Sequence, residues 1–126
     1  MLAQLEQDWK YCCLITGGSR GIGKHIQDVF VSNGHTLYAP TREELNLSSD
    51  FILEDLKFDI LVNNAGIMDD FIPVHAVTNE EWNKVLGVNL NGPFYLTRSI
   101  LPLMVERKKG SIINVSSVAG LGGGKA

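Results

Sequence analysis

The sequence lacks the features that mark membrane, secreted or nucleic-acid-binding proteins. It has only two cysteines, Cys12 and Cys13, and their adjacency suits neither a disulfide framework nor a metal site. No apolar run approaches the roughly 18 residues of a membrane helix, and the acidic start at residues 1–8 is unlike a signal peptide. Lysine and arginine (11) do not outnumber aspartate and glutamate (14), which disfavours a nucleic-acid surface. We therefore expect a cytoplasmic protein with buried thiols, no metal, no membrane contact and no nucleic-acid partner.

What the sequence does contain is an alternation of short β-rich runs with helical stretches. This pattern is typical of parallel βαβ units with right-handed crossovers. The length of 126 residues suits one domain, which we place at residues 11–126 after an N-terminal extension at 1–10. Apolar runs predict strands at residues 11–16, 35–39, 58–62 and 111–115, and the first and third of these should be buried.

Apolar residues at helical spacing and capping signals predict the connecting helices. One runs from about Ile22 to a glycine cap at Gly34, and a short one follows Ser48 or Ser49 and ends near Leu56. A capping box at Thr78 and Glu81 predicts a helix from Asn79 to about Leu86. A longer helical stretch, about residues 88–106, should bend at Gly92-Pro93 and Pro102.

One crossover is too short. Only about six residues, Thr41 to Asn46, separate the second predicted strand from the apolar residues at 45–47. A parallel crossover needs about a dozen residues. Any strand at 45–47 must therefore be rudimentary, or this edge of the sheet has been trimmed.

A glycine-rich segment at residues 16–23 joins the first predicted strand to the first predicted helix. Gly17, Gly21 and Gly23 suit a tight turn, a close approach of the backbone to a pyrophosphate, and close packing of helix on sheet. The N–H groups at the start of the helix would then face the phosphates. A glycine-rich turn without a ligand is the alternative, but the position between a buried strand and an amphipathic helix favours nucleotide binding.

The glycine spacing and three later motifs resemble, in order, the short-chain dehydrogenase/reductase family, and are most similar in wording to its 3-oxoacyl-(acyl-carrier-protein) reductases. Asn63-Asn64-Ala65-Gly66 is similar to the N-N-A-G motif of the family. Asn89 matches the asparagine of its catalytic tetrad, and residues 111–117 match the strand that ends in its catalytic serine. The resemblance covers the chain from about residue 11 to its end.

The resemblance implies an α/β fold, a Rossmann-like three-layer parallel sheet of strand order 3-2-1-4-5 with strand 3 vestigial, truncated before the C-terminal strands. It implies the cofactor-binding part of an NAD(P)-dependent oxidoreductase that interconverts a carbonyl and an alcohol by hydride transfer. The partner would be a small-molecule carbonyl or alcohol substrate, and the full-length protein would be a homo-oligomer.

The family roles fall on named positions of this sequence. The residues that the resemblance assigns to the cofactor are Gly17, Ser19, Arg20, Gly21, Ile22, Gly23, Asn46, Leu47, Asn64, Ala65 and Gly66. Ser117, which lies 28 residues after Asn89, would hydrogen-bond the substrate carbonyl and stabilise the developing oxyanion. Ser116 would then be a strand-end residue bonded to nearby backbone. Asn89 would hold a water in a proton relay, or be a polar residue at a helix bend.

The end of the second predicted strand bears on the choice of cofactor. An acid there would bind the ribose 2′-OH and select NAD, but this chain has Thr41-Arg42. Arg42 and Arg20 suit a 2′-phosphate through charge-assisted contacts, so NADP is favoured over NAD. Glu43 and Glu44 complicate this prediction, because a small shift would bring one of them to the ribose.

The family also uses a Tyr-x-x-x-Lys pair as general acid/base and ribose clamp, and the sequence contains no such spacing. The residues four positions after Tyr11, Tyr38 and Tyr95 are isoleucine, arginine and serine, and the family tyrosine would fall beyond Ala126. We therefore expect this chain by itself to be inactive, as the N-terminal part of a longer reductase. The alternative is a non-catalytic dinucleotide-binding or vestigial module.

Overall fold

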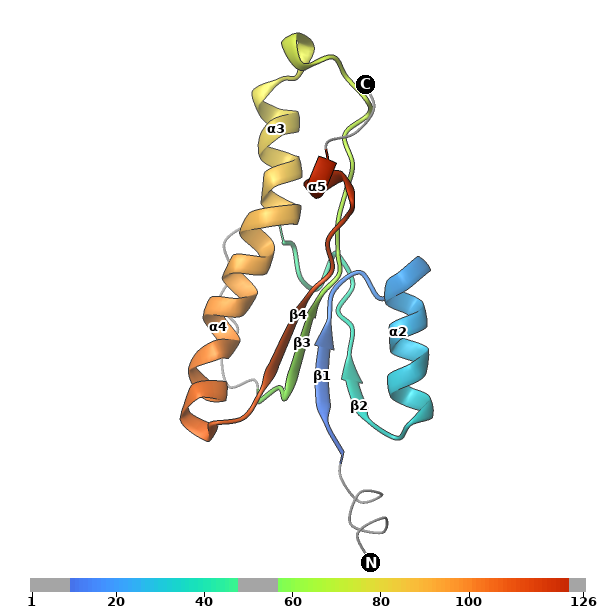
Figure 1. Cartoon of the computed structure of the whole chain (residues 1–126), viewed down its shortest axis with the longest axis vertical. Coiled ribbons are helices and arrows are strands. Elements are labelled where there is room, and N and C mark those ends of the chain that lie inside the picture. The colour runs from blue at the N-terminus through green and yellow to red at the C-terminus, as the bar shows by residue number, and fades with distance from the viewer. Residues whose placement is uncertain (1–9, 48–56, 123–126) are drawn as a thin grey trace, which may run out of the picture.

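The computed structural model of the chain describes residues 10–47 and 57–122. Its centre is a four-stranded parallel sheet with helices on either side (Figure 1). The strands are β1 (Cys12–Ile15), β2 (Thr36–Tyr38), β3 (Ile60–Asn63) and β4 (Ser111–Asn114). Their order, β2-β1-β3-β4, is the predicted one without its third strand. Residues 45–47 form no strand, so within the described residues this edge of the sheet lacks the third strand, which the sequence predicted to be rudimentary or trimmed.

Alternate residues of the central strands point to opposite faces of the sheet, and each face packs on a different helix. Leu14 and Leu61 lie in a core cluster with Leu96, Ile100 and Met104 of helix α4 (Gly92–Arg107). This division into a helix, a sheet and a further helix layer is what a doubly wound parallel sheet requires.

The opposite face packs on helix α2 (Gly21–Ser32). Cys13 and Val62, both fully or almost fully buried, contact Ile26 and Phe30 there. Burial raises the pKa of the Cys13 thiol to about 11, so this cysteine is a buried core thiol, as the sequence predicted. Cys12, for which the same was predicted, is only partly buried.

Helix α2 ends in a motif that also starts β2. Gly34 has φ +78 and donates its N–H to the Val31 carbonyl, while His35 donates to the Phe30 carbonyl. These two bonds make a Schellman motif, which requires a residue in the left-handed region and therefore favours glycine. The predicted cap at Gly34 is confirmed. Because the His35 N–H bonds to the helix, β2 begins at Thr36 and not at residue 35 as predicted.

The other strand boundaries also differ from the predicted ranges. β1 is shorter than 11–16, β3 lies at 60–63 where 58–62 was predicted, and β4 ends at 114 where 115 was predicted. At the start of β3 the chain bends at Asp59, whose carboxylate accepts the Cys12 N–H at 2.9 Å. The helix predicted after Ser48 or Ser49 lies outside the described residues.

The two later helices run on as one long element (Figure 1). Helix α3 (Asn79–Leu86) begins at the predicted capping box, in which Thr78 and Glu81 bond reciprocally. A π-helical turn, η2 (Gly87–Asn91), then joins α3 to α4. The irregularity thus precedes Gly92-Pro93, where a bend was predicted. Pro93 has no N–H to direct to the Asn89 carbonyl, as an α-helix would require.

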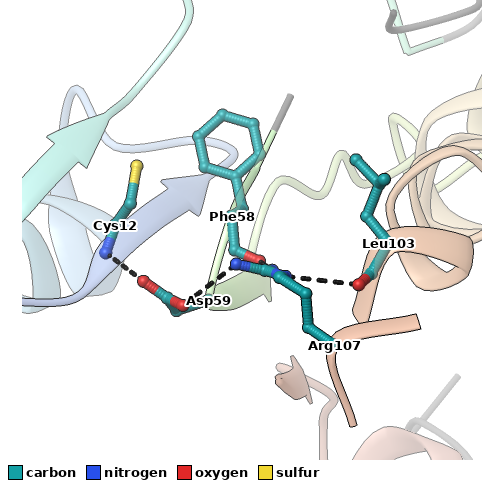
Figure 2. Close-up of polar contacts among 5 residues, drawn as sticks. All are labelled: Cys12, Phe58, Asp59, Leu103 and Arg107. Atoms are coloured by element: carbon teal, nitrogen blue, oxygen red, sulfur yellow. Dashed lines mark hydrogen bonds and ion pairs between the residues drawn. The ribbon is translucent and has the colours of Figure 1, made fainter. Parts of the chain in front are cut away.

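A side-chain clamp ties the end of α4 to the start of β3 (Figure 2). The Arg107 guanidinium donates to the Phe58 carbonyl at 2.6 Å and to the Leu103 carbonyl at 3.2 Å. It also pairs with the Asp59 carboxylate at 3.4 Å. Since Asp59 accepts the Cys12 N–H as well, one arginine links α4, β3 and β1 at the N-terminal edge of the sheet.

Candidate nucleotide-binding site

A cleft of about 910 Å³ opens at the carboxyl ends of β1, β2 and β3. Parallel α/β sheets bind ligands at this edge, where the strand order reverses on the two sides of β1. All the residues that the sequence predicted at a cofactor line this cleft. They come from three segments, at residues 17–23, 42–47 and 64–66. The lining residues include Gly17, Ser19, Arg20, Gly21, Ile22, Gly23, Arg42, Asn46, Leu47, Asn64, Ala65 and Gly66.

Glycines of the loop at residues 17–23 are required for different reasons, as Gly21 and Gly23 show. Gly21 has φ +57, and no atom lies within 4 Å of the place where its Cβ would be. Gly23 sits so close to the loop that a Cβ would overlap the Gly17 carbonyl oxygen and the Asn64 amide nitrogen. The first glycine leaves space at the cleft, and the second allows helix α2 to touch the loop.

Thr16 joins the glycine loop to the segment after β3. Its hydroxyl oxygen accepts the N–H groups of Asn64 at 3.2 Å and Ala65 at 3.0 Å. The Asn64 side chain donates in return to the carbonyls of Thr16 and Gly17, both at 3.1 Å. Thr16 is only 4% exposed, and its bonds to Asn64 and Ala65 are partly buried, whereas the bond to the Gly17 carbonyl is exposed. Together the four bonds fix the two walls of the cleft relative to each other.

The start of helix α2 offers donors to the cleft. Its N-cap residue, Arg20, makes no side-chain capping hydrogen bond, so the first N–H groups of the helix are not satisfied by a cap. Arg20 and Arg42 line the cleft, and across residues 10–47 and 57–122 neither guanidinium has a recorded ion pair. This edge of the sheet therefore presents positive charge and unpaired donors.

The wall after β2 contains a single turn at residues 41–45. The Leu45 N–H donates to the Thr41 carbonyl at 3.0 Å. Leu45 and Leu47 are 9% and 8% exposed and pack into the α4-side core. Leu47, predicted beside the adenine, thus lines the cleft from a mostly buried position, and Asn46 lines the cleft between the two leucines.

Asn89 lies in the π-helical turn and binds the backbone beyond the N-N-A-G segment. Its carboxamide oxygen accepts the Ile67 N–H and its amide nitrogen donates to the Ile67 carbonyl, both at 2.8 Å. Gly66 is next to this pair, since its Cβ would lie 3.6 Å from the Asn89 oxygen. Asn89 therefore holds the cleft segment after β3 in place, a contact that the sequence did not predict.

Ser116 and Ser117 follow β4 and are both exposed. The Ser117 hydroxyl accepts the Ala119 N–H at 3.2 Å, at the start of the short helix α5 (Ala119–Gly122). Neither serine lines the cleft. Among the described residues, no group of three histidine, cysteine, aspartate or glutamate side chains could hold a metal.

A dinucleotide fits this donor set. An anionic diphosphate suits the open position at Gly21, the uncapped start of α2 and the two arginines. The cleft volume lies within the range of cofactor pockets, roughly 300–1,000 Å³.

No described helix is long and apolar enough to cross a bilayer.

The comparisons with known proteins identify the family. The family profile described as short chain dehydrogenase matches residues 42–126. This chain belongs to the short-chain dehydrogenase family. The resemblance stated from the motifs is thereby confirmed, and the fold agrees with it.

Individual relatives agree with this family. The chain is 36% identical to the 3-oxoacyl-(acyl-carrier-protein) reductase FabG of Thermotoga maritima, over 88% of this chain and 57% of the relative. It is 33% identical to the NADP-dependent 3-hydroxy acid dehydrogenase YdfG of Salmonella typhi, over 85% of this chain and 54% of the relative. A solved structure of 4-hydroxyisoleucine dehydrogenase complexed with NADH superposes with a TM-score of 0.80 at 30% identity, covering 89% of this chain and 58% of that one.

The short-chain dehydrogenase chain spans just over half the length of these relatives. The match to FabG extends over 141 aligned positions, more than the 126 residues of the chain, so the relative has internal residues without a counterpart here. The single turn at residues 41–45, where a parallel crossover would need about a dozen residues, agrees with such a shortening.

Two residues that shape the cleft are absent from the predicted site, although the sequence holds a signal for each. Thr16 lies directly before a glycine loop, which places its hydroxyl beside the next parallel strand. Glu44 follows Thr41 by three residues, the same spacing that predicts the capping box at Thr78 and Glu81.

Proposed function

We propose that this chain is the cofactor-binding part of an NADP-dependent oxidoreductase that interconverts a carbonyl and an alcohol. The observation that carries the proposal is the cleft, which gathers the glycine loop, the start of α2 and the N-N-A-G segment at one edge of the sheet. When bound, the nicotinamide dinucleotide supplies or accepts the hydride. The residues of this chain bind it, orient it and hold the cleft walls together.

Each wall would have a separate task. The N–H groups of the glycine loop and of the start of α2 would bind the diphosphate. Asn64, Ala65 and Gly66, fixed by Thr16 and Asn89, would line the nicotinamide side, and Asn46 and Leu47 the adenine. Ser117 would bind the substrate carbonyl, and Asn89 would order a water for proton transfer; both roles rest on the family resemblance.

The proposed preference for NADP rests on charge. Arg20 and Arg42 line the cleft, and guanidinium groups suit a 2′-phosphate through paired, charge-assisted hydrogen bonds. A relative named as NADP-dependent supports this preference, whereas a similar structure holds NADH. Relatives with this fold therefore include users of both cofactors, and the arginines of this chain favour NADP.

We propose that these 126 residues by themselves bind the nucleotide without turning over substrate. The sequence has no Tyr-x-x-x-Lys spacing, and loss of a general acid typically costs about 10²- to 10⁴-fold in rate. The alternative of a non-catalytic module is not favoured by the relatives, which are named as dehydrogenases and reductases. The cytoplasmic location, the small-molecule substrate and a homo-oligomer of the full-length protein complete the proposal.

Calorimetric titration of NADP⁺ into the chain tests the binding step. A matched pair of glycine variants locates the site. Gly23→Ala would overlap the glycine loop, whereas Gly120→Ala meets no atom within 4 Å. We expect Gly23→Ala to weaken NADP⁺ binding at least tenfold and Gly120→Ala to leave it unchanged. Equal affinities of both variants and the wild type would place any binding outside this cleft.

A further inference from the structure

The turn at residues 41–45 is closed by a reciprocal pair of hydrogen bonds. The Thr41 N–H donates to the Glu44 carboxylate at 2.7 Å, and the Glu44 N–H donates to the Thr41 hydroxyl at 3.3 Å. This is the arrangement of a capping box, here on a single turn. Bonds of a carboxylate to backbone N–H groups are charge-assisted and stronger than neutral ones.

The two acids of this turn, Glu43 and Glu44, differ in their position relative to the cleft. Thr41, Arg42, Glu43 and Leu45 all line the cleft, and Glu44 is the one residue of the turn that does not. Leu45 packs in the core cluster between the sheet and α4, which anchors the turn to the fold. The Glu44 carboxylate is thus held at the Thr41 N–H, while Arg42, two positions earlier, lines the cleft.

A freed carboxylate at this position would oppose an anionic ligand in two ways. It could pair with Arg42, which has no recorded ion pair within the described ranges. It could also accept hydrogen bonds from ribose hydroxyls, as the acid in NAD-selective sites does. Either contact would weaken binding of a 2′-phosphate and favour a ligand with a free 2′-OH.

We propose that the Thr41–Glu44 box determines the selectivity for NADP over NAD by withholding the Glu44 carboxylate from the ribose end of the cleft. Glu44 and Thr41 are then positioning residues, which act through Arg42. This inference rests on the proposed function of the cleft and adds to it the device that keeps the second acid after Arg42 away from a 2′-phosphate, while Glu43 remains in the lining.

Three variants at position 44 separate the effect of the Glu44 charge from the effect of its side-chain length, which allows it to close the box. Glu44→Gln keeps the reach and the box without the charge, because glutamine serves in capping boxes as glutamate does. Glu44→Asp keeps the charge on a side chain one methylene too short to close the box. Glu44→Asn has the shape of the aspartate variant and no charge, so it is the matched control for any loss of local structure.

The measurement is the ratio of the NAD⁺ and NADP⁺ dissociation constants, determined by calorimetric titration of each variant. We expect Glu44→Gln and Glu44→Asn to keep the wild-type ratio within about twofold. We expect Glu44→Asp to lower the ratio about tenfold, the scale of one hydrogen bond to a charged group. A purely structural role of the box would change the aspartate and asparagine variants equally, and that result would overturn the proposal.

The remaining outcomes separate this inference from the function on which it rests. Wild-type chain that binds neither nucleotide would overturn both the proposed function and the inference. Wild-type chain that binds NADP⁺ tightly, with the same ratio in all three variants, would overturn the inference alone. A loss of selectivity in Glu44→Gln as large as in Glu44→Asp would also overturn it, since the glutamine closes the box.

Discussion

Replacing Thr16 with valine removes one hydroxyl that holds two walls of the cleft together. The Thr16 oxygen accepts two backbone N–H groups, from Asn64 and Ala65, at 3.2 and 3.0 Å. Valine has nearly the same shape, so it fills the same space and leaves both donors without an acceptor. A sheltered donor that loses its partner costs about 1–3 kcal/mol. Because both donors are only partly buried, we expect a loss of about 2–3 kcal/mol in the free energy of unfolding.

Thr16→Ser is the matched control for this prediction. Serine keeps the hydroxyl and removes one methyl group, which should cost about 0.8 kcal/mol. Urea denaturation followed by circular dichroism measures both variants, and NADP⁺ titration should show weaker binding for the valine variant alone. A valine variant within about 0.5 kcal/mol of the wild type, or a serine variant that loses as much as the valine variant, would refute the role given to the hydroxyl.

Three further predictions concern other parts of the fold. Arg107→Leu removes the 2.6 Å bond to the Phe58 carbonyl and should lower the free energy of unfolding by about 1.5–3 kcal/mol; urea denaturation against an Arg107→Lys control measures it. Hydrogen bonds from Thr78, first from its backbone and then from its side chain, lower the pKa of Glu81. The stability that Glu81 adds over a Glu81→Ala variant is therefore present at pH 7 and lost as the pH falls through this lowered pKa, which urea denaturation of both chains at a series of pH values measures. Burial raises the pKa of Cys13 to about 11, so a thiol reagent at pH 8 should modify it only after unfolding in urea; fast reaction of the folded chain would contradict its burial.

The sheet could be predicted from the sequence because local patterns determine it. Continuous apolar runs at β1 and β3 are what a strand buried on both faces requires. Gly34 indicated the end of α2, and the Thr78–Glu81 spacing indicated the start of α3. The structure contains the capping hydrogen bonds expected at both places. The short crossover after β2 was also readable, since chain length alone excludes a full parallel connection.

The contacts that build the cleft could not be read in the same way, because they join residues far apart in the chain. Asn89 bonds to the backbone of Ile67, 22 positions away, and Thr16 bonds to Asn64, 48 positions away. The π-helical turn at Gly87–Asn91 has no simple periodic signal, although Pro93 indicated an irregularity nearby. The Thr41–Glu44 box has a readable signal, the three-residue spacing of a capping box, which the prediction of Glu43 or Glu44 as a ribose ligand does not use.

Amide chemical-shift mapping by NMR tests the central claim, that this short-chain dehydrogenase chain binds NADP in the cleft at the carboxyl ends of the strands. Addition of NADP⁺ should shift the backbone amides of the glycine loop at residues 17–23, of the turn at 41–45 and of the segment at 64–66. The amides at the opposite edge of the sheet, around Arg107 and Asp59, should stay unchanged and serve as an internal control. Shifts confined to that opposite edge, or no shifts at millimolar NADP⁺, would contradict the account.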